Sequence, residues 1–369
     1  MATLGTPSVK PLIKTESRIA TFDLARGVLI ILMVLIHVLD FYGNDEVRFG
    51  VFGTAIKWAA SWQVAAWFVL IMGVFVTYSD QDNLTKGLMR ALNLFALGYL
   101  LNFARGTVPL WLSLKMDLVT PEQMGLITPI TELLIVDILQ FAGLALACCL
   151  LVKHYFPRTI YWLGCALIVM SVSPYLWDFS TDLGALNELI KLFVGNKSQG
   201  AMFPLFPWLA YPLAGMVFGY WLKKSKRIQS LFDLFLVIGV TLVSIGVLIT
   251  LNDPQYHIAS NMRSGMGLII CLTGGALVFL WACQYLVNSI PPNPCFELLY
   301  FWGNNVTSYY IIQWILIGWG LMLFQAQQLA LTHTLLAMFG VMVLSHYLLR
   351  VWLWCTNANK KVWKYEPQG

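Results

Sequence analysis

The stretch TFDLARGVLIILMVLIHVLDFYG, residues 21–43, is the segment that decides the fold. It is long enough to cross the roughly 30 Å hydrocarbon core of a membrane as one α-helix. It carries four ionisable side chains in two pairs, Asp23 with Arg26 and His37 with Asp40. Because ionisable groups are costly in hydrocarbon, those inside a span indicate function. Arg26 and His37 are eleven residues apart, and a turn of about 100° per residue puts them on nearly one helix face.

Comparable apolar segments continue along the chain and predict an all-α polytopic membrane protein with about ten transmembrane helices. Hydrophobic residues make up 59% of the 369 residues and charged residues 11%, a balance that excludes an ordinary soluble domain. The strict alternation of β-barrel strands is absent from the sequence. The predicted spans are 22–42, 56–78, 86–104, 133–152, 159–176, 203–222, 231–251, 265–287, 304–324 and 332–354.

The positions of lysine and arginine predict the orientation of these spans. With both termini in the cytoplasm, sixteen of the 23 basic residues lie on the cytoplasmic side and seven on the other. The positive-inside rule favours this arrangement. The net charge of +5 is therefore interpreted as a topology signal, and no nucleic-acid partner is expected.

The chain is expected to form one membrane domain over residues 18–358, between a disordered cytoplasmic tail at 1–17 and a second cytoplasmic tail at 359–369. The longer connections fall on the outer side, which indicates function there. One of them contains DLGALNELIKLF, residues 182–193, whose apolar spacing predicts a helix on the membrane surface. Gly215 and Gly219 have the G-x-x-x-G spacing of helix contacts.

Polar residues in the outer halves of the spans predict a cavity beside His37. Gln313 is expected deeper, and Arg263, in an outer segment, could meet an acceptor at the cavity mouth. The alternative is that these groups only hydrogen-bond between helices. The polar residues expected at about the depth of His37 are Gln63, Asn102, Asp137 and Gln140.

His37 has properties suited to proton transfer, with an unperturbed pKa of about 6.5 and two nitrogens that can play separate roles. Asp40, one turn later on the same face, could orient the ring and stabilise an imidazolium. The alternative is a ring satisfied by a neighbouring carbonyl, with Asp40 capping the helix. Arg26 could serve the site, or it could only pair with Asp23 or reach the headgroups.

The sequence contains no motif typical of disulfide-rich, metal-binding, nucleotide-binding or hydrolase proteins. The seven cysteines include no C-x-x-C pair, so neither a disulfide framework nor a metal site is expected. There is no glycine-rich nucleotide loop, no G-x-S-x-G elbow and no H-E-x-x-H motif, which excludes familiar ATPases, lipases and zinc proteases.

Several segments resemble polytopic membrane acyltransferases. FDLARG followed by an apolar run resembles the opening of these enzymes, and Arg26 with His37 matches the R-x10-H pattern of the acyltransferase-3 family. Three segments look more like the heparan-α-glucosaminide N-acetyltransferase family: AAWFVLIMG (65–73), VDILQFAGLA (136–145) and PLFPWLAYPLAGMVFG (204–219). GNNVTSYYIIQ (303–313) resembles a late segment of the superfamily, with Gln313 where many relatives have histidine. The chain has no histidine between helices 1 and 2, where the heparan enzyme has its catalytic histidine.

The resemblance implies an enzyme that moves an acyl group, usually acetyl, from cytoplasmic acyl-CoA to a sugar or glycan acceptor on the far side of the membrane. His37, with Asp40, would be the catalytic base or acyl carrier. Membrane lipid, acyl-CoA and the glycan would be its partners, and a bacterial inner membrane is the expected location. The expected donor-binding residues are Arg26, Lys223, Lys224, Lys226 and Arg227, and the expected substrate-binding residues are Gln63, Asn102, Asp137, Gln140, Arg263 and Gln313.

Two other functions stay open from the sequence. A proton-coupled transporter or flippase could use His37, Asp40 and Asp137 as a relay. A non-catalytic relative could only bind a lipid-linked glycan.

Overall fold

A computed structural model describes residues 19–79, 83–177, 179–195, 200–258 and 263–356. Across these ranges the secondary structure is helical apart from two isolated bridges, and ten helical segments are long and apolar enough to cross a membrane. The predicted all-α polytopic fold is confirmed. The predicted tails, 1–17 and 359–369, lie outside the described residues, and the cytoplasmic location of both termini stays a prediction.

The elements follow one another as helices of very different lengths. In chain order they are α1 (Ala20–Tyr42), α2 (Asp45–Phe49), α3 (Val51–Ala60), α4 (Gln63–Tyr78), α5 (Leu84–Asn102), η1 (Phe103–Thr107), α6 (Val108–Lys115), α7 (Pro121–Met124), α8 (Pro129–Leu133), α9 (Ile138–Tyr155), α10 (Thr159–Leu176), α11 (Gly184–Val194), α12 (Leu205–Trp208), α13 (Ala210–Lys224), α14 (Ile228–Asn252), α15 (Pro254–His257), α16 (Met266–Ser289), α17 (Pro294–Asn304), α18 (Val306–Phe324) and α19 (Leu331–Cys355).

Two predicted spans have different boundaries. The span predicted at 86–104 continues as one helical segment from Leu84 to Lys115, because η1 joins α5 to α6 without a break. The span predicted at 133–152 begins only at Ile138, because Asp137 has extended backbone angles and caps the helix. The short helix α17 between α16 and α18 was not predicted.

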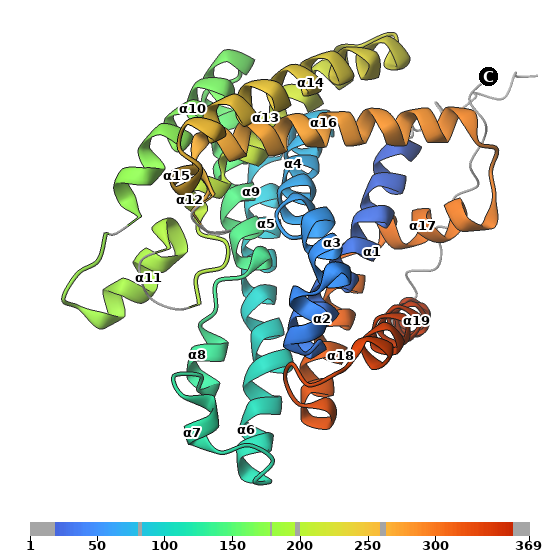
Figure 1. Ribbon diagram of the computed structural model, residues 1–369. Coiled ribbons are helices and arrows are strands. Elements are labelled where there is room, and N and C mark those ends of the chain that lie inside the picture. Colours follow the sequence, from blue (N-terminus) through green and yellow to red (C-terminus); the bar gives the residue numbers. More distant parts are fainter. Residues whose placement is uncertain (1–18, 80–82, 178, 196–199, 259–262, 357–369) are drawn as a thin grey trace, which may run out of the picture.

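The first span lies at the centre of the bundle. Helix α1 contacts α3, α4, α16, α17, α18 and α19 and is mostly buried, whereas α14 is mostly exposed. In Figure 1, α14 and α16 cross the top of the view side by side, while α5, η1 and α6 run down through the centre. The segment with the ionisable side chains is thus surrounded by other helices.

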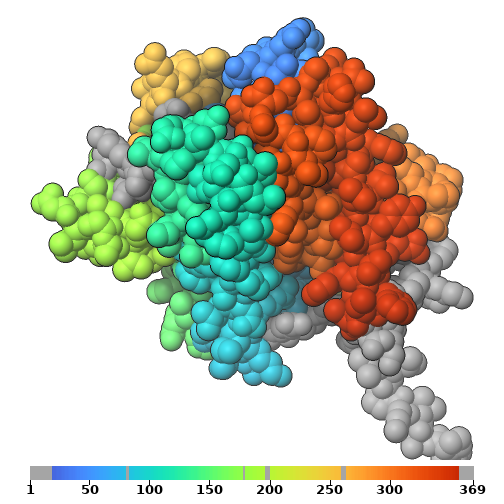
Figure 2. Space-filling model, turned by 90° about the horizontal axis from the view of Figure 1, so that it is seen from below, coloured from blue at the N-terminus to red at the C-terminus, as the bar shows by residue number. Residues whose placement is uncertain are grey.

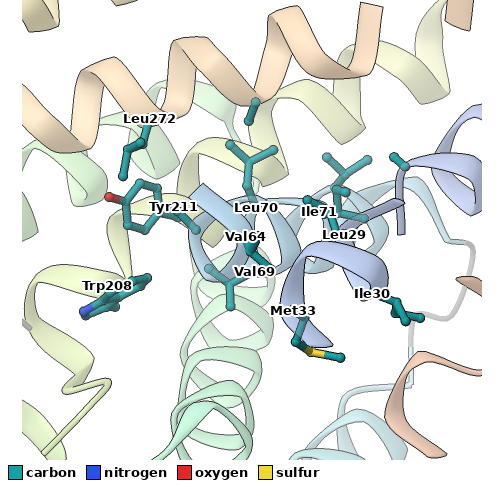
Figure 3. Close-up of a cluster of buried hydrophobic side chains, with 14 of the residues drawn as sticks. Leu29, Ile30, Met33, Val64, Val69, Leu70, Ile71, Trp208, Tyr211 and Leu272 are labelled. Carbon is teal, nitrogen blue, oxygen red and sulfur yellow. The ribbon is translucent and has the colours of Figure 1, made fainter. Parts of the chain in front are cut away.

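The apolar centre is built where α1 and α4 meet α12, α13 and α16 (Figure 3). Within a membrane the lipid tails are as apolar as the side chains, so such a centre is held by close packing more than by removal of water. The buried side chains labelled there are Leu29, Ile30, Met33, Val64, Val69, Leu70, Ile71, Trp208, Tyr211 and Leu272.

Glycines allow α4 and α13 to cross at backbone contact. A β-carbon at Gly215 would lie 2.1 Å from the carbonyl oxygen of Leu70, and one at Gly219 would lie 2.1 Å from that of Val74. Gly73 on α4 is as close to Pro212 on α13. The predicted G-x-x-x-G helix contact is therefore confirmed.

Replacing Gly215 with valine is expected to lower the free energy of unfolding by about 3 kcal/mol, because the helices must separate to admit the side chain. The thermal unfolding temperature of the detergent-solubilised protein measures this effect. Gly164→Val is the matched control, because a β-carbon there meets nothing within 4 Å. Equal unfolding temperatures for the two variants would contradict the close crossing.

Helix α11 confirms the helix predicted within 182–193. One side of the helix carries exposed apolar residues. On the other side buried Lys191 pairs with Glu188 at 2.5 Å, and the Glu188 side chain remains partly exposed. The exposed apolar residues are Leu183, Leu186, Leu189 and Phe193. This amphipathic arrangement fits the predicted location on the membrane surface, which stays a prediction.

A histidine caps α16 outside the membrane-spanning segments. Nδ1 of buried His257 accepts a hydrogen bond of 3.2 Å from the backbone N–H of Gly267, in the first turn of α16. Burial lowers the pKa of His257, while Asp253 acts in the opposite direction. Protonation would remove the acceptor and put positive charge at the positive end of the helix dipole.

The unfolding temperature is therefore expected to fall by a few degrees between pH 7.5 and pH 5.5. The folded-state pKa of His257 lies below the unfolded value of about 6.5, so its stabilising effect is complete above that value and is lost as the pH falls below it. His257→Gln keeps an acceptor that does not titrate, so this variant should show a smaller fall. The same fall in both proteins would argue against the cap as the titrating element.

Candidate active site

His37 is held between α1 and α18. Its Nδ1 lies 2.9 Å from Nε2 of Gln313, and the centre of its ring lies 4.3 Å from that of Trp314. Gln313 is fully buried, whereas His37 keeps part of its surface open. One nitrogen of the imidazole is thus fixed by the protein, in a residue that is half-buried.

A buried ion pair lies beside this ring. Arg105 Nη2 is 2.5 Å from Asp137 Oδ2, and the two side chains are only 10% and 11% exposed. The hydroxyl of Tyr310 donates to the same Oδ2 at 3.2 Å, and the backbone N–H of Ile138 donates to Oδ1 at 2.7 Å. Because both carboxylate oxygens accept hydrogen bonds, the burial of this charge is compensated.

Local sequence explains how Arg105 reaches this position. Pro109 has no N–H to donate to the carbonyl of Arg105 four residues earlier, and the chain forms the π-helical turn η1 instead of a regular α-helical turn. The backbone of α18 fits closely here, since a β-carbon at Gly318 would lie 1.9 Å from the Arg105 carbonyl oxygen. Trp319 Nε1 donates to the Ala104 carbonyl at 3.0 Å. Turns of this kind are frequent at functional sites.

Trp314 connects the histidine to the ion pair. Cζ of Arg105 lies 4.0 Å from the centre of the Trp314 ring, which also packs on His37. Seen from below, the segment containing η1 and α6 lies directly beside α18 (Figure 2). We call the set His37, Arg105, Asp137, Tyr310, Gln313 and Trp314 the His37 cluster.

Two predicted site residues lie apart from the cluster. Asp40 pairs with Lys57 at 3.9 Å, whereas the His37 ring contacts the Gln313 amide. Gln63 binds the backbone where α3 meets α4, with Nε2 2.5 Å from the Trp58 carbonyl oxygen. The contacts of the described residues therefore give the orienting position to Gln313 instead of Asp40, and they do not bring Gln63 to the ring.

Asn102 and Gln140 hold the backbone around Asp137. Asn102 Nδ2 donates to the carbonyls of Leu133 and Ile135, at 3.1 and 2.7 Å. The Oε1 of Gln140 accepts from the Asp137 N–H at 3.2 Å, which completes a capping box. The expectation that Asp137 lies inside a span is wrong, because α9 begins after it.

The remaining predicted residues lie elsewhere. Arg26 contacts the Gly303 carbonyl at 3.3 Å and Asp23 at 3.7 Å, where α1 crosses α17. Arg263 donates to the Gly195 carbonyl at 3.3 Å, just after α11. The predicted phosphate-binding residues, exposed at the end of α13 and in the turn after it, are Lys223, Lys224, Lys226 and Arg227. Among the described residues, no group of three or more His, Cys, Asp and Glu is placed to hold a metal ion.

Residues 18–249 match the family model described as heparan-alpha-glucosaminide N-acetyltransferase, catalytic. The chain belongs to this family. The predicted resemblance is thereby confirmed, and it indicates membrane acetyltransferase activity. No curated protein matched the chain in a separate comparison.

The region matched to the acetyltransferase family contains only part of the His37 cluster. His37, Arg105 and Asp137 lie within residues 18–249, while α18 contributes its members from beyond that region. Sequence reasoning did not assign Arg105, Tyr310 or Trp314 to the site. Tyr310 precedes Gln313 by three residues and shares its helix face, and that spacing was the available signal. Arg105 gave no comparable signal, because a terminal arginine is typical of many spans.

Proposed function

We propose that this chain transfers an acetyl group from acetyl-CoA to a hydroxyl or amine of a sugar or glycan acceptor, with His37 as the base. The observation that carries the proposal is the environment of His37. The imidazole is held by Gln313 and Trp314, the His37 residue is half-buried, and it lies next to the buried ion pair of Arg105 with Asp137. Fixed general bases with a neighbouring charged group are typical of acyl-transfer sites.

The contact between His37 and Gln313 sets the chemistry of the ring. The Gln313 amide nitrogen lies at Nδ1 and its buried oxygen has no partner, and in the proposed mechanism the amide is turned by 180°, so that its oxygen accepts from Nδ1–H. The ring then carries its proton on Nδ1, and Nε2 is free to accept one. Nε2 then takes the proton of the acceptor as its oxygen or nitrogen attacks the thioester carbonyl carbon. Collapse of the tetrahedral intermediate breaks the carbon–sulfur bond, and the imidazolium returns the proton to the CoA thiolate.

The donor and acceptor are proposed to approach from opposite sides of the membrane. The exposed basic residues at the end of α13 would attract the phosphates of CoA from the cytoplasmic side, as would Arg26 near the start of α1. The acceptor would reach His37 from the opposite side, where the sequence predicts the longer connections. A bacterial inner membrane fits this arrangement.

The test is acetyl transfer by the protein reconstituted in liposomes. Acetyl-CoA labelled in the acetyl group is supplied on one side, and glucosamine, N-acetylglucosamine and a reducing oligosaccharide are supplied on the other. We expect label in an acceptor and release of free CoA in equal amounts. Absence of transfer to these acceptors together with acceptor movement across the bilayer would overturn the proposal and favour a transporter.

A further inference from the structure

The second guanidinium nitrogen of Arg105 is the unexplained group of the His37 cluster. Nη2 is committed to Asp137 and, at 3.3 Å, to Asn102 Oδ1. Nη1 is buried and has no hydrogen-bond partner. Water does not readily supply one, because the side chain is only 10% exposed. A buried donor without a partner is rare in native proteins and calls for an explanation. The simplest is that a ligand supplies the missing acceptor.

The surroundings of Arg105 keep this donor in one place. The guanidinium is bonded to Asp137 on one nitrogen and packs over the Trp314 ring at 4.0 Å. The same indole ring packs against His37, so the guanidinium and the imidazole are neighbours across one side chain. A donor fixed before the substrate arrives needs no reorganisation during the reaction, which is the condition for electrostatic catalysis.

Charge indicates what kind of ligand atom Nη1 would bind. The positive charge of Arg105 is already balanced by Asp137. A second carboxylate, Glu132, lies against Gly106, where a β-carbon would be 2.6 Å from its Oε2, and burial raises the pKa of Glu132. A permanently anionic group would therefore meet no unbalanced positive charge here. A neutral carbonyl oxygen that gains negative charge only during the reaction fits better.

We infer that Arg105 Nη1 holds the thioester carbonyl oxygen of the acyl donor and stabilises the oxyanion of the tetrahedral intermediate. This inference rests on the proposed acetyltransferase function. When the acceptor attacks the carbonyl carbon, the electrons of the C=O bond move to the oxygen, and the N–H of Nη1 donates to it. When the carbon–sulfur bond breaks, those electrons return to reform the carbonyl of the product ester or amide. Asp137 and Tyr310 then act as positioning residues for the guanidinium.

Arg105→Lys tests the inference most directly. Lysine can keep the ion pair with Asp137, but it lacks the planar fork that serves two partners at once. We expect kcat to fall by 10²- to 10³-fold, the usual effect of losing one oxyanion donor, while the KM for acetyl-CoA changes less than about threefold. Arg90→Lys on the exposed part of α5 is the matched control and should keep wild-type kinetics.

A purely structural role for Arg105 makes the opposite predictions. In that case Arg105→Lys would keep wild-type turnover, or a double variant, Arg105→Met with Asp137→Asn, would keep it because both charges are removed together. We expect the double variant, whose amide still caps α9, to unfold at a higher temperature than Arg105→Met alone while kcat stays at least 10²-fold low. Recovery of kcat in either variant overturns the inference, as does a raised KM with unchanged kcat.

Failure of the inference is distinguishable from failure of the proposed function. If wild-type protein consumes no acetyl-CoA with any acceptor of the panel, the proposed function fails. If wild-type protein turns over and Arg105→Lys does so equally well, only the role of Arg105 fails.

Discussion

Replacement of His37 with alanine should lower kcat for acetyl transfer by about 10³-fold, which is within the range for loss of a general base. The ring is the titratable group that the structure holds next to Arg105 with part of its surface open. Its removal leaves the acceptor proton without a base at the moment of attack. The measurement is single-turnover transfer of labelled acetyl from acetyl-CoA, with protein purified in the same detergent.

Two further substitutions show whether the fall in kcat is caused by loss of the His37 ring. His333→Ala changes an exposed histidine at the start of α19 and should leave kcat unchanged. Gln313→Leu keeps the volume but removes the hydrogen bond to Nδ1, and we expect a loss of about tenfold, equivalent to one hydrogen bond of about 1.4 kcal/mol. Turnover of His37→Ala within threefold of wild type would eliminate the proposed mechanism.

Replacement of Asp137 with alanine should have the largest effect on stability, a loss of about 3–5 kcal/mol in the free energy of unfolding. Breaking a buried ion pair leaves the other charge buried without compensation. Asp137→Ala would leave the guanidinium of Arg105 in that state, and it would also remove the cap of α9 and the acceptor of the Tyr310 hydroxyl. The unfolding temperature in detergent and resistance to proteolysis both report the loss.

The exposed pair between Arg48 and Asp45 is the matched control. Its atoms lie 3.3 Å apart, but the Asp45 side chain is 81% exposed, so Asp45→Ala should cost less than about 1 kcal/mol. Asp137→Asn should fall between the two, because an amide can still cap α9 but carries no charge. If Asp137→Ala unfolds at the same temperature as Asp45→Ala, the buried pair does not stabilise the fold.

The location of the site explains how the two effects are related. Its residues come from the C-terminal part of α1, the π-helical turn η1, the start of α9 and one face of α18. The ion pair joins η1 to the start of α9, whereas the contact of His37 with Gln313 joins α1 to α18. Substitution of His37 should therefore reduce turnover with little unfolding, whereas substitution of Asp137 should reduce both.

The sequence by itself determined the ten spans and identified His37 as a candidate for the site. Span length and hydropathy are properties of a continuous segment, and a bilayer of fixed thickness selects them without regard to the rest of the chain. The same local reasoning identified the G-x-x-x-G contact of Gly215 and the ionisable residues of the first span. It could not place the helix boundary at Asp137, because capping depends on the backbone angles of a single residue.

Only the tertiary structure decided which polar groups meet. Gln313 is 276 residues from His37 along the chain, and Arg105 reaches Asp137 because a π-helical turn rotates it from the direction that regular helix geometry would give. Asp40, one turn from His37 in sequence, instead pairs with Lys57. Helix periodicity assigns a face to each residue but not the neighbour that covers that face. The neighbour is set by how the helices pack, which depends on the whole bundle.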